Sequence, residues 1–274
     1  MRPIFSSLLH ALISCALLFG AGTAVALPSS PSVVSGSVTF EQAAGTLTIT
    51  NVSGTIINWN AFAIAAGSTT TFLQPGASNA VLNRVLTGTP TTISGELRSN
   101  GRLVLINPAG FFVAPGARIN ASFLTLSTFN LSDADFLAGI PNFVPQEGSG
   151  SIVINGTLSI AGSLSLYAPT IEIDGPLQTP SGSVILPPTP GINITTNLVG
   201  GGGSISIGQG GSLSLGGGTG GGGISIGQGG SLSLGGGTGG GIITIQSAIP
   251  EPSTYVLLLV GLAGLGVFAR RHAG

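Results

Sequence analysis

Hydrophobic and polar residues alternate with a period of two over most of this chain, in short runs bounded by Gly, Pro, Asn and Asp. No long stretch shows the period of an amphipathic helix. The clearest alternating runs are residues 45–50, 102–106, 151–154, 163–166 and 170–173. The pattern predicts an all-β fold between residues 32 and 245.

An internal repeat indicates which β fold this is. The run that starts at Ile205 recurs from Ile224, and a partial third copy starts at Ile243. The same offset occurs upstream in less uniform sequence, where it relates Ile152, Ile154 and Leu158 to Ile171, Ile173 and Leu177, and Ile173 to Ile192. An offset that persists while the sequence changes favours a structural period. We therefore predict a parallel β-helix, a solenoid with coils of about 19 residues.

In such a solenoid, equivalent apolar side chains stack in the interior and glycines turn the corners. Ser206, Ser212 and Ser214 would then alternate outward. The alternative for residues 200–241 is a flexible Gly/Ser linker, but a linker would not place Ile and Leu at alternating positions with a fixed period. No Phe occurs between residues 168 and 254. The Gly-rich coils should therefore have a thinner core and fray first.

Residues 54–139 contain motifs of a known family. In chain order these are residues 57–64 (INWNAFAI), 72–75 (FLQP), 80–85 (AVLNRV), 93–95 (ISG), 100–110 (NGRLVLINPAG) and 131–136 (LSDADF). They resemble the N-terminal secretion domain of filamentous haemagglutinin and other two-partner-secreted proteins. The resemblance covers roughly a third of the chain. It implies a right-handed parallel β-helix capped at its N-terminus by extra strands, which agrees with the repeat.

The Asn-Pro-Asn-Gly-like motif of that family is Asn107-Pro108-Ala109-Gly110 here, with alanine at the third position. The physical interpretation is a β-turn in which Pro108 presets φ and Gly110 takes a positive φ. The resemblance implies that an outer-membrane transporter recognises this region during export. Alanine preserves the turn but not a side-chain contact from that position. Asn83 and Arg84 either pin a turn through backbone hydrogen bonds, which we favour, or form a solvated corner.

Residues 1–26 are typical of a secretory signal peptide. Arg2 supplies the positive start and residues 8–18 the apolar centre. Ala24 and Ala26 are the small residues of a signal peptidase cleavage site. We therefore expect the mature chain to start after Ala26.

Two other interpretations of the N-terminus are weaker. A membrane-spanning helix is disfavoured because Gly20, Gly22 and Thr23 dilute the apolar run before it reaches spanning length. Residues 12–15, which end at the only cysteine, faintly resemble a lipoprotein signal box, but apolar sequence continues well past Cys15. If Cys15 is removed with the signal, the mature body has no thiol for disulfides or for thiolate metal sites.

The C-terminus combines Pro250-Glu251-Pro252-Ser253, an apolar run at residues 255–269, and the pair Arg270-Arg271. The run is slightly short for a membrane span of about 20 residues, and its basic end should stay cytoplasmic. The prolines keep the preceding segment extended. The three parts resemble the PEP-CTERM sorting tail. That resemblance implies cleavage near Pro-Glu-Pro by a membrane-embedded exosortase and a stop-transfer role for the arginines. A plain tail anchor is the alternative.

Charge and residue types exclude further functions. The chain has no lysine and a net charge of −1, and Arg84, Arg98, Arg102 and Arg118 are the only cations between the two ends. Without a basic patch, nucleic-acid binding is not expected. Both histidines lie in the end segments, so bases and nucleophiles in the body are limited to carboxylates and hydroxyls.

Parallel β-helices also include polysaccharide lyases and hydrolases, which need paired carboxylates across a cleft. Asp133 and Asp135 are the nearest pair; alternation would place them on one strand face, where a turn or strand-end role is more expected. Glu172 and Asp174 flank an isoleucine and should face solvent. The Gly-rich repeats contain Gln where a calcium-binding solenoid needs Asp, at residues 209 and 228. We therefore expect no catalytic residue, no metal site and no cofactor.

The sequence predicts four segments. They are a signal peptide (1–26), a haemagglutinin-like secretion domain (27–145), Gly/Ser-rich β-helix coils (146–247) and a PEP-CTERM tail (248–274) with a transmembrane helix at 255–269. The predicted function is that of a structural or adhesin-like protein. It would be exported as an inner-membrane-anchored precursor to the cell surface or extracellular matrix of a Gram-negative bacterium.

The expected partners are signal peptidase, an exosortase-like membrane protease, an outer-membrane two-partner transporter and exopolysaccharide. Two other functions stay open at this point. An exposed aromatic groove would favour a carbohydrate-binding module. Carboxylates clustered in a cleft would favour a polysaccharide lyase or hydrolase.

Overall fold

The computed structural model describes residues 26–179 and, beyond them, strand segments at 183–186, 193–196, 204–207, 212–216, 224–226, 231–235 and 243–245. These parts contain twenty-two strands and one short helix. No helix among the described residues is long and apolar enough to cross a membrane. The predicted helix at 255–269 and most of the predicted signal peptide lie outside the described residues.

The strands before the helix are β1 (Ser29–Ser35), β2 (Val38–Ala43), β3 (Thr46–Asn51), β4 (Thr55–Ala61), β5 (Thr69–Leu73), β6 (Ala80–Val85), β7 (Thr91–Ile93), β8 (Glu96–Ile106), β9 (Phe111–Val113) and β10 (Arg118–Ser127). Helix α1 (Asp133–Ala138) follows. The remaining strands are β11 (Ile152–Ile154), β12 (Thr157–Ile160), β13 (Leu164–Tyr167), β14 (Ile171–Ile173), β15 (Leu177–Gln178), β16 (Ser183–Leu186), β17 (Asn193–Thr196), β18 (Ser204–Ile207), β19 (Ser212–Gly216), β20 (Ile224–Ile226), β21 (Ser231–Gly235) and β22 (Ile243–Ile245).

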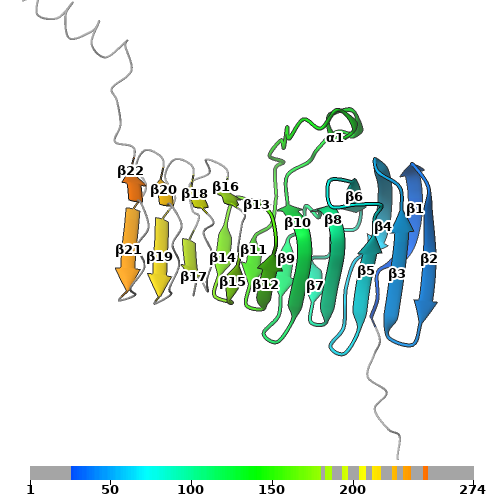
Figure 1. The fold of residues 1–274 in the computed structure, drawn as a ribbon, viewed down its shortest axis with the longest axis horizontal. Helices are drawn as coiled ribbons and strands as arrows, with labels where there is room; N and C mark the ends of the chain where they lie inside the picture. Colours follow the sequence, from blue (N-terminus) through cyan, green and yellow to red (C-terminus); the bar gives the residue numbers. More distant parts are fainter. Residues whose placement is uncertain are drawn as a thin grey trace, which may run out of the picture.

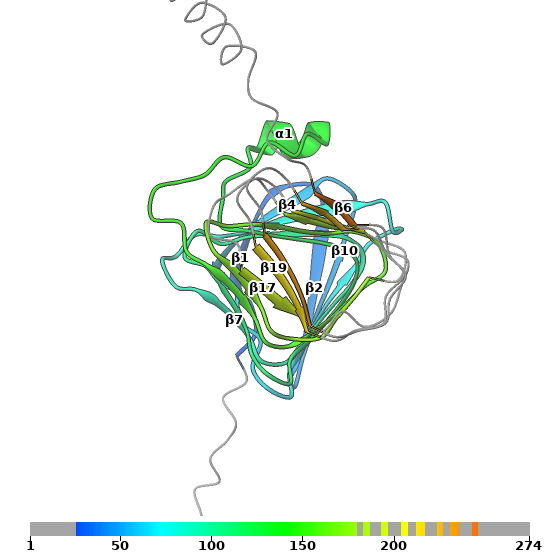
Figure 2. The same cartoon turned by 90° about the vertical axis from the view of Figure 1, so that its left-hand side faces the viewer.

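These strands form the parallel β-helix that the sequence predicts. The largest sheet has the main order β1-β4-β6-β8-β10-β13-β16-β18-β20-β22, and two smaller sheets have the orders β14-β11-β9-β7 and β17-β19-β21. From β4 onward every strand pair described is parallel, so each coil lies directly on the one before it. The coils follow one another along the long axis in Figure 1, and the view along that axis in Figure 2 shows the sheets around a common interior.

The offset predicted from the repeat is the pairing register of the later coils. Ile152 pairs with Ile171, and Ile205 with Ile224. Within the Gly-rich segment, β18 to β22 keep this register, as coils rather than a linker would. Ile192, which the same offset assigned, lies outside the described residues. Earlier coils are longer, since Leu97 pairs with Ile119. Corner loops absorb the difference in length because only the strands need to match.

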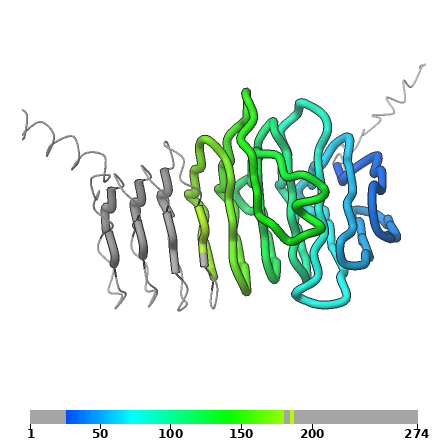
Figure 3. The backbone as a smooth tube through the Cα atoms, turned by 90° about the horizontal axis from the view of Figure 1, so that it is seen from above, coloured from blue at the N-terminus to red at the C-terminus, as the bar shows by residue number. Residues whose placement is uncertain are grey.

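The N-terminal end of the solenoid is closed by antiparallel strands. Strand β1 pairs antiparallel with β4, and β2 with β3, so the free end of the first coil is covered. Figure 3 shows these strands, in blue, at one end of the molecule. Phe40 of β2 packs edge-on against Trp59, and Trp59 edge-on against Phe62, with ring centroids 5.8 and 5.6 Å apart. This is the N-terminal cap that the family resemblance implies.

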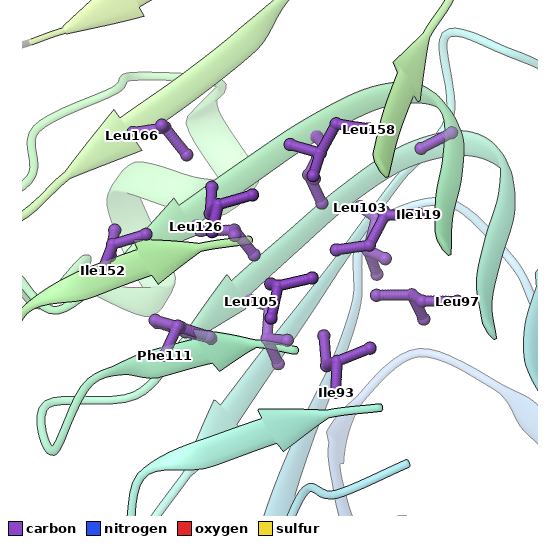
Figure 4. Close-up of a cluster of buried hydrophobic side chains, with 14 of the residues drawn as sticks. Ile93, Leu97, Leu103, Leu105, Phe111, Ile119, Leu126, Ile152, Leu158 and Leu166 are labelled. Atoms are coloured by element: carbon purple, nitrogen blue, oxygen red, sulfur yellow. The ribbon is translucent and has the colours of Figure 1, made fainter. Parts of the chain in front are cut away.

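The core consists of stacks of apolar side chains that run along the axis. One stack contains Leu97, Ile119, Leu158 and Leu177, which are in register on successive coils and are all buried. Similar stacks pass through Leu103 and Phe111, and Figure 4 shows members of all three. Burial of each such side chain stabilises the fold by about 1.5–3 kcal/mol. The alternation in the sequence is therefore the inside–outside pattern of the coils.

Candidate functional site

Residues 130–149, called the excursion below, leave the solenoid between β10 and β11 and carry α1. Phe111 pairs with Ile152, whereas Ile152 pairs with Ile171, so the coil that contains the excursion is much longer than the next one. The extra chain projects from the top of the solenoid in Figure 1. The predicted secretion-motif residues lie around the points where the excursion leaves and rejoins the coils.

The Asn107-Pro108-Ala109-Gly110 motif forms the predicted β-turn between β8 and β9. The Gly110 N–H donates to the Asn107 carbonyl at 3.0 Å, and Gly110 has a φ of +110°. The Asn107 side-chain oxygen also accepts from the Ala109 N–H at 3.0 Å. An Asn at the first position thus closes the turn twice, once through its backbone and once through its side chain.

The same Asn107 side chain ties the turn to the preceding coil. Its amide nitrogen donates to the Thr89 carbonyl at 3.0 Å and to the Thr91 hydroxyl at 2.9 Å, and the side chain is fully buried. Both ends of the carboxamide are therefore used at once. Asp would lack the donor end, and Ala would lack both ends.

The other side of the turn receives the returning excursion. The Gly150 N–H donates to the Pro108 carbonyl at 2.8 Å, and the Phe111 N–H to the Ser151 carbonyl at 2.9 Å. A Cβ at Gly150 would lie 2.3 Å from the Ala109 carbonyl oxygen. Close approach of the two backbones therefore requires glycine here. The end of the excursion therefore binds to the motif turn through backbone hydrogen bonds where it rejoins the solenoid.

Asn83 and Arg84 do not form a turn or a solvated corner, because both lie within strand β6. Asn83 is fully buried; its side-chain oxygen accepts from the Trp59 indole N–H at 2.9 Å, and its amide donates to the Val104 carbonyl at 3.4 Å. A buried indole N–H needs an acceptor, and Asn83 supplies one inside the coil stack. The sequence around Asn83 does not reveal this role, because its hydrogen-bond partner, Trp59, is 24 residues away.

Arg84 holds the start of the excursion. Its guanidinium donates to the Leu131 carbonyl at 2.5 Å and pairs with the Asp133 carboxylate at 2.5 Å. The Arg84 side chain is only 15% exposed, whereas that of Asp133 is 47% exposed. A guanidinium can bridge a carbonyl and a carboxylate at once because it has several fixed N–H donors.

The expectation that Asp133 and Asp135 share a strand face is wrong, since Asp133–Ala138 is helical. The Ser132 hydroxyl caps the helix by accepting from the Asp135 N–H at 3.0 Å, and Gly139 ends it in the left-handed conformation. Both acids lie in the first turn, where the helix dipole favours negative charge. The signal in the sequence was Ser132 at the N-cap with a glycine just beyond the last turn.

The inner side of the excursion is apolar. Leu131, Phe136 and Phe143 cover a small buried cluster formed by Ile56, Leu82 and Ile106 on the wall of the solenoid. Phe143 also stacks on Tyr167 with centroids 4.0 Å apart, and burial raises the pKa of the Tyr167 phenol. The excursion is therefore a docked element that contributes a second, smaller core.

The acidic side chains of the described part lie in separate surroundings. No group of three or more His, Cys, Asp or Glu side chains there could hold a metal ion. Asp133 is paired with Arg84, and Asp135 accepts from the Asn142 amide at 3.2 Å. Glu172 and Asp174 face solvent as predicted. Each of these four carboxylates therefore has its own structural partner or lies in solvent.

A shallow groove of about 560 Å³ crosses the outer face of β5, β8, β10 and β12. Its lining includes one carboxylate, Glu96, and one aromatic residue, Phe72, whose side chain is fully buried. The Arg98 guanidinium, with which Glu96 shares a hydrogen bond at 2.8 Å, lowers the pKa of the Glu96 carboxyl. The groove therefore has neither an exposed aromatic ring nor clustered acids.

The predicted processing residues are placed only in part. Ala24, Pro250, Glu251, Pro252, Ser253, Arg270 and Arg271 lie outside the described residues. Ala26 is exposed, and its carbonyl accepts from the Ala65 N–H at 2.8 Å. Leu27 packs against the main core. A chain that started at Leu27 would thus begin with a residue of the folded body.

Two family models match this chain. The TPS secretion domain matches residues 24–249, and the PEP-CTERM protein-sorting motif matches residues 248–271. Both resemblances drawn from the sequence motifs are confirmed. The two models together mark an exported protein.

A heme/hemopexin-binding protein of Haemophilus influenzae is 35% identical over 106 residues. That match covers 38% of this chain and 12% of the relative, so the chain spans far less than the full length of this curated relative. The HMW1 secretion domain from Haemophilus influenzae has a TM-score of 0.56 and 22% identity, covering 80% of this chain and 84% of that one, and it shows the same fold. A filamentous hemagglutinin secretion domain has a TM-score of 0.49 and 15% identity, covering 80% and 99%.

Proposed function

Because this chain belongs to the family of the TPS secretion domain, which matches residues 24–249, we propose that it is secreted across the outer membrane with a dedicated transporter partner. The protein then serves as a structural or adhesin-like element of the bacterial surface or extracellular matrix. The observation that carries this proposal is one solenoid with both an N-terminal cap and a C-terminal sorting motif at residues 248–271.

The motif turn and the excursion support a transport role through shape. Asn107 fixes the turn from inside, so the surface offered to a partner is the backbone of Pro108 and Ala109 together with the docked excursion. The alanine at the third motif position contributes no polar side chain to this surface. A transporter that reads this region therefore reads the folded excursion rather than a side chain at residue 109.

The sorting tail defines the second step. An exosortase-like protease recognises Pro250, Glu251 and Pro252, while Arg270 and Arg271 hold the precursor in the inner membrane until cleavage. Signal peptidase acts at the other end, after Ala26. The cleaved body is then retained outside the cell, with exopolysaccharide as the associated material.

The relatives do not extend this proposal to a ligand or a reaction. The name of the Haemophilus influenzae relative says that it binds heme and hemopexin, but the matched part is 12% of that protein. The features supported by the comparisons are the TPS secretion domain and its fold. A non-enzymatic role agrees with carboxylates that are paired one by one with Arg84 and Asn142.

Deletion of residues 250–274 followed by cell fractionation tests the proposal. Without the tail, the body should leave the envelope fraction and collect in the culture medium. A matched control changes Arg102→Gln in the full chain, which removes a body arginine and keeps the tail. Unchanged surface display of the truncated chain would refute the sorting step, and a body trapped in the cytoplasm in both forms would refute export.

A further inference from the structure

We propose that the groove across β5, β8, β10 and β12 binds an acidic polysaccharide whose chain runs along the solenoid axis. The inference rests on the proposed location outside the cell, where such polymers occur. It assigns a ligand class and a site that the secretion and sorting functions do not need.

The groove contains a row of polar side chains that occupy the same register position on successive coils. Thr71 pairs in register with Arg98, Arg98 with Asn120, and Asn120 with Ser159, and all four line the groove. Neighbouring strands lie about 4.8 Å apart, so these side chains form a straight row with that spacing. A polymer of repeated sugar units lying across the strands would meet an equivalent donor or acceptor at every coil.

The cations on this face have spare binding capacity. Arg98 is 56% exposed and, among the described residues, makes a single ion pair, with Glu96 at 2.8 Å. Exposed pairs of this kind are weak, so the remaining N–H groups of Arg98 can bind another carboxylate at little cost. Arg118 is exposed and pairs in register with Glu96, so it lies at the margin of the groove rather than in its lining, and it makes no ion pair within the described part of the chain. The face therefore carries two cations and one acid.

Glu96 lines the groove, but both of its carboxylate oxygens already accept hydrogen bonds from neighbouring side chains. The Asn120 amide donates to one of its oxygens at 2.9 Å, Arg98 to the other at 2.8 Å, and its side chain is 22% exposed. The carboxylate thus orients Arg98 and Asn120, and the Arg98 guanidinium offsets its charge. Its charge does not dominate the face that a polymer approaches.

The absence of an exposed ring in the groove lining selects acidic over neutral sugars. Neutral sugars stack their C–H faces on aromatic side chains, and the Phe72 side chain beneath this groove is fully buried. A uronate carboxylate can instead accept two parallel hydrogen bonds from one arginine guanidinium. An extended peptide is disfavoured because β5, β8, β10 and β12 are each paired with a neighbouring coil, which leaves no strand edge within the groove.

Affinity electrophoresis of the full-length protein, purified from the cells that produce it, tests this site. Gels would contain polygalacturonate, dextran or duplex DNA. Of the three polymers, we expect only polygalacturonate to slow the protein. The double variant Arg98→Gln/Arg118→Gln should bind polygalacturonate roughly tenfold more weakly, as for the loss of charge-assisted hydrogen bonds. Arg102→Gln is the matched control, because Arg102 stacks on Phe123 at 4.3 Å and pairs in register with Phe123 rather than with a residue that lines the groove.

Each contrary result has a definite meaning. No retardation by polygalacturonate, equal loss of binding in the Arg102→Gln variant, equal binding to dextran, or binding to DNA alone would each overturn the acidic-polysaccharide site. Thermal melting of all variants checks that the fold is retained. Fractionation separates the two proposals: a surface-displayed protein that fails to bind refutes the groove alone, whereas a binding-competent protein found inside the cell refutes the proposed location.

Discussion

The coils before the excursion and the Gly-rich coils near the C-terminus share one backbone plan and differ in what fixes them. In both regions parallel strands stack in register, with Leu97 on Ile119 in the first and Ile205 on Ile224 in the second. The first region adds a T-shaped Trp59–Phe62 pair and a buried indole–Asn83 hydrogen bond. The second repeats Ile, Leu, Ser and Gly without any aromatic residue. Alternation and repeat length suffice to set the pairing register of the coils. Large buried side chains and buried polar pairs determine how stable a coil is against unfolding.

The largest effect is expected at the aromatic cluster. Trp59→Ala removes a fully buried ring and leaves Asn83 without its donor, which should cost about 3–5 kcal/mol of unfolding free energy. In denaturant titrations, repeat proteins lose weak coils first. We therefore expect two unfolding transitions, an early one from the Gly-rich coils and a late one from the coils that contain the aromatic cluster. The variant should lower the denaturant midpoint of the late transition and leave that of the early one unchanged. A shift of both transitions would mean that the two regions unfold as one unit. Val33→Ala, at an exposed residue of β1, is the control.

A smaller effect is expected at the base of the excursion. Arg84→Ala breaks the hydrogen bond to Leu131 and leaves Asp133 unpaired, at a cost of about 1.5–3 kcal/mol. Limited proteolysis should then cut within residues 130–149 much faster than in the unchanged chain. Asp133→Asn keeps the Leu131 contact and should give a clearly smaller increase. Equal cleavage rates in all three proteins would show that Arg84 does not hold the excursion.

Acid should weaken the face that contains Glu96 by a modest amount. Arg98 holds the pKa of Glu96 below its ordinary value in the folded chain. The stabilisation is therefore complete above the ordinary pKa of 4.5 and is lost as the pH falls through the lower folded value. Because Arg98 is largely exposed, the effect should stay under about 1 kcal/mol. Glu96→Gln should flatten the stability profile below pH 5, and an unaltered profile would contradict this role.

The smallest effect is expected when a whole coil is removed. Deletion of residues 205–223 joins Ser204 to Ile224 and restores the same sequence in the same register. The melting temperature of the early transition should change little. A deletion that is shorter by a single position, 205–222, should destabilise the end because such a slip exchanges the inner and outer side chains. Equal behaviour of the two deletions would show that this region is a linker rather than coils.

The sequence contained the fold but only part of the candidate site. The repeat offset and the alternation predicted stacked coils, because both depend on neighbours one coil apart. The motif turn at Asn107 was also predictable, since Pro and Gly restrict their own backbone. The contact between Arg84 and Leu131 spans 47 residues and leaves no periodic signal. Short helix α1 was missed because Asp133 and Asp135 alternate with small residues as a strand would.

Parallel stacking also has a mechanical consequence. When a force on the C-terminal end acts along the solenoid axis, the outermost coil must unfold before the next coil bears the force. Each repeat of about 19 residues would release about 60–70 Å of extended chain. The Gly-rich coils would then behave as a short series of breakable links, which lengthens under shear while the aromatic end stays folded.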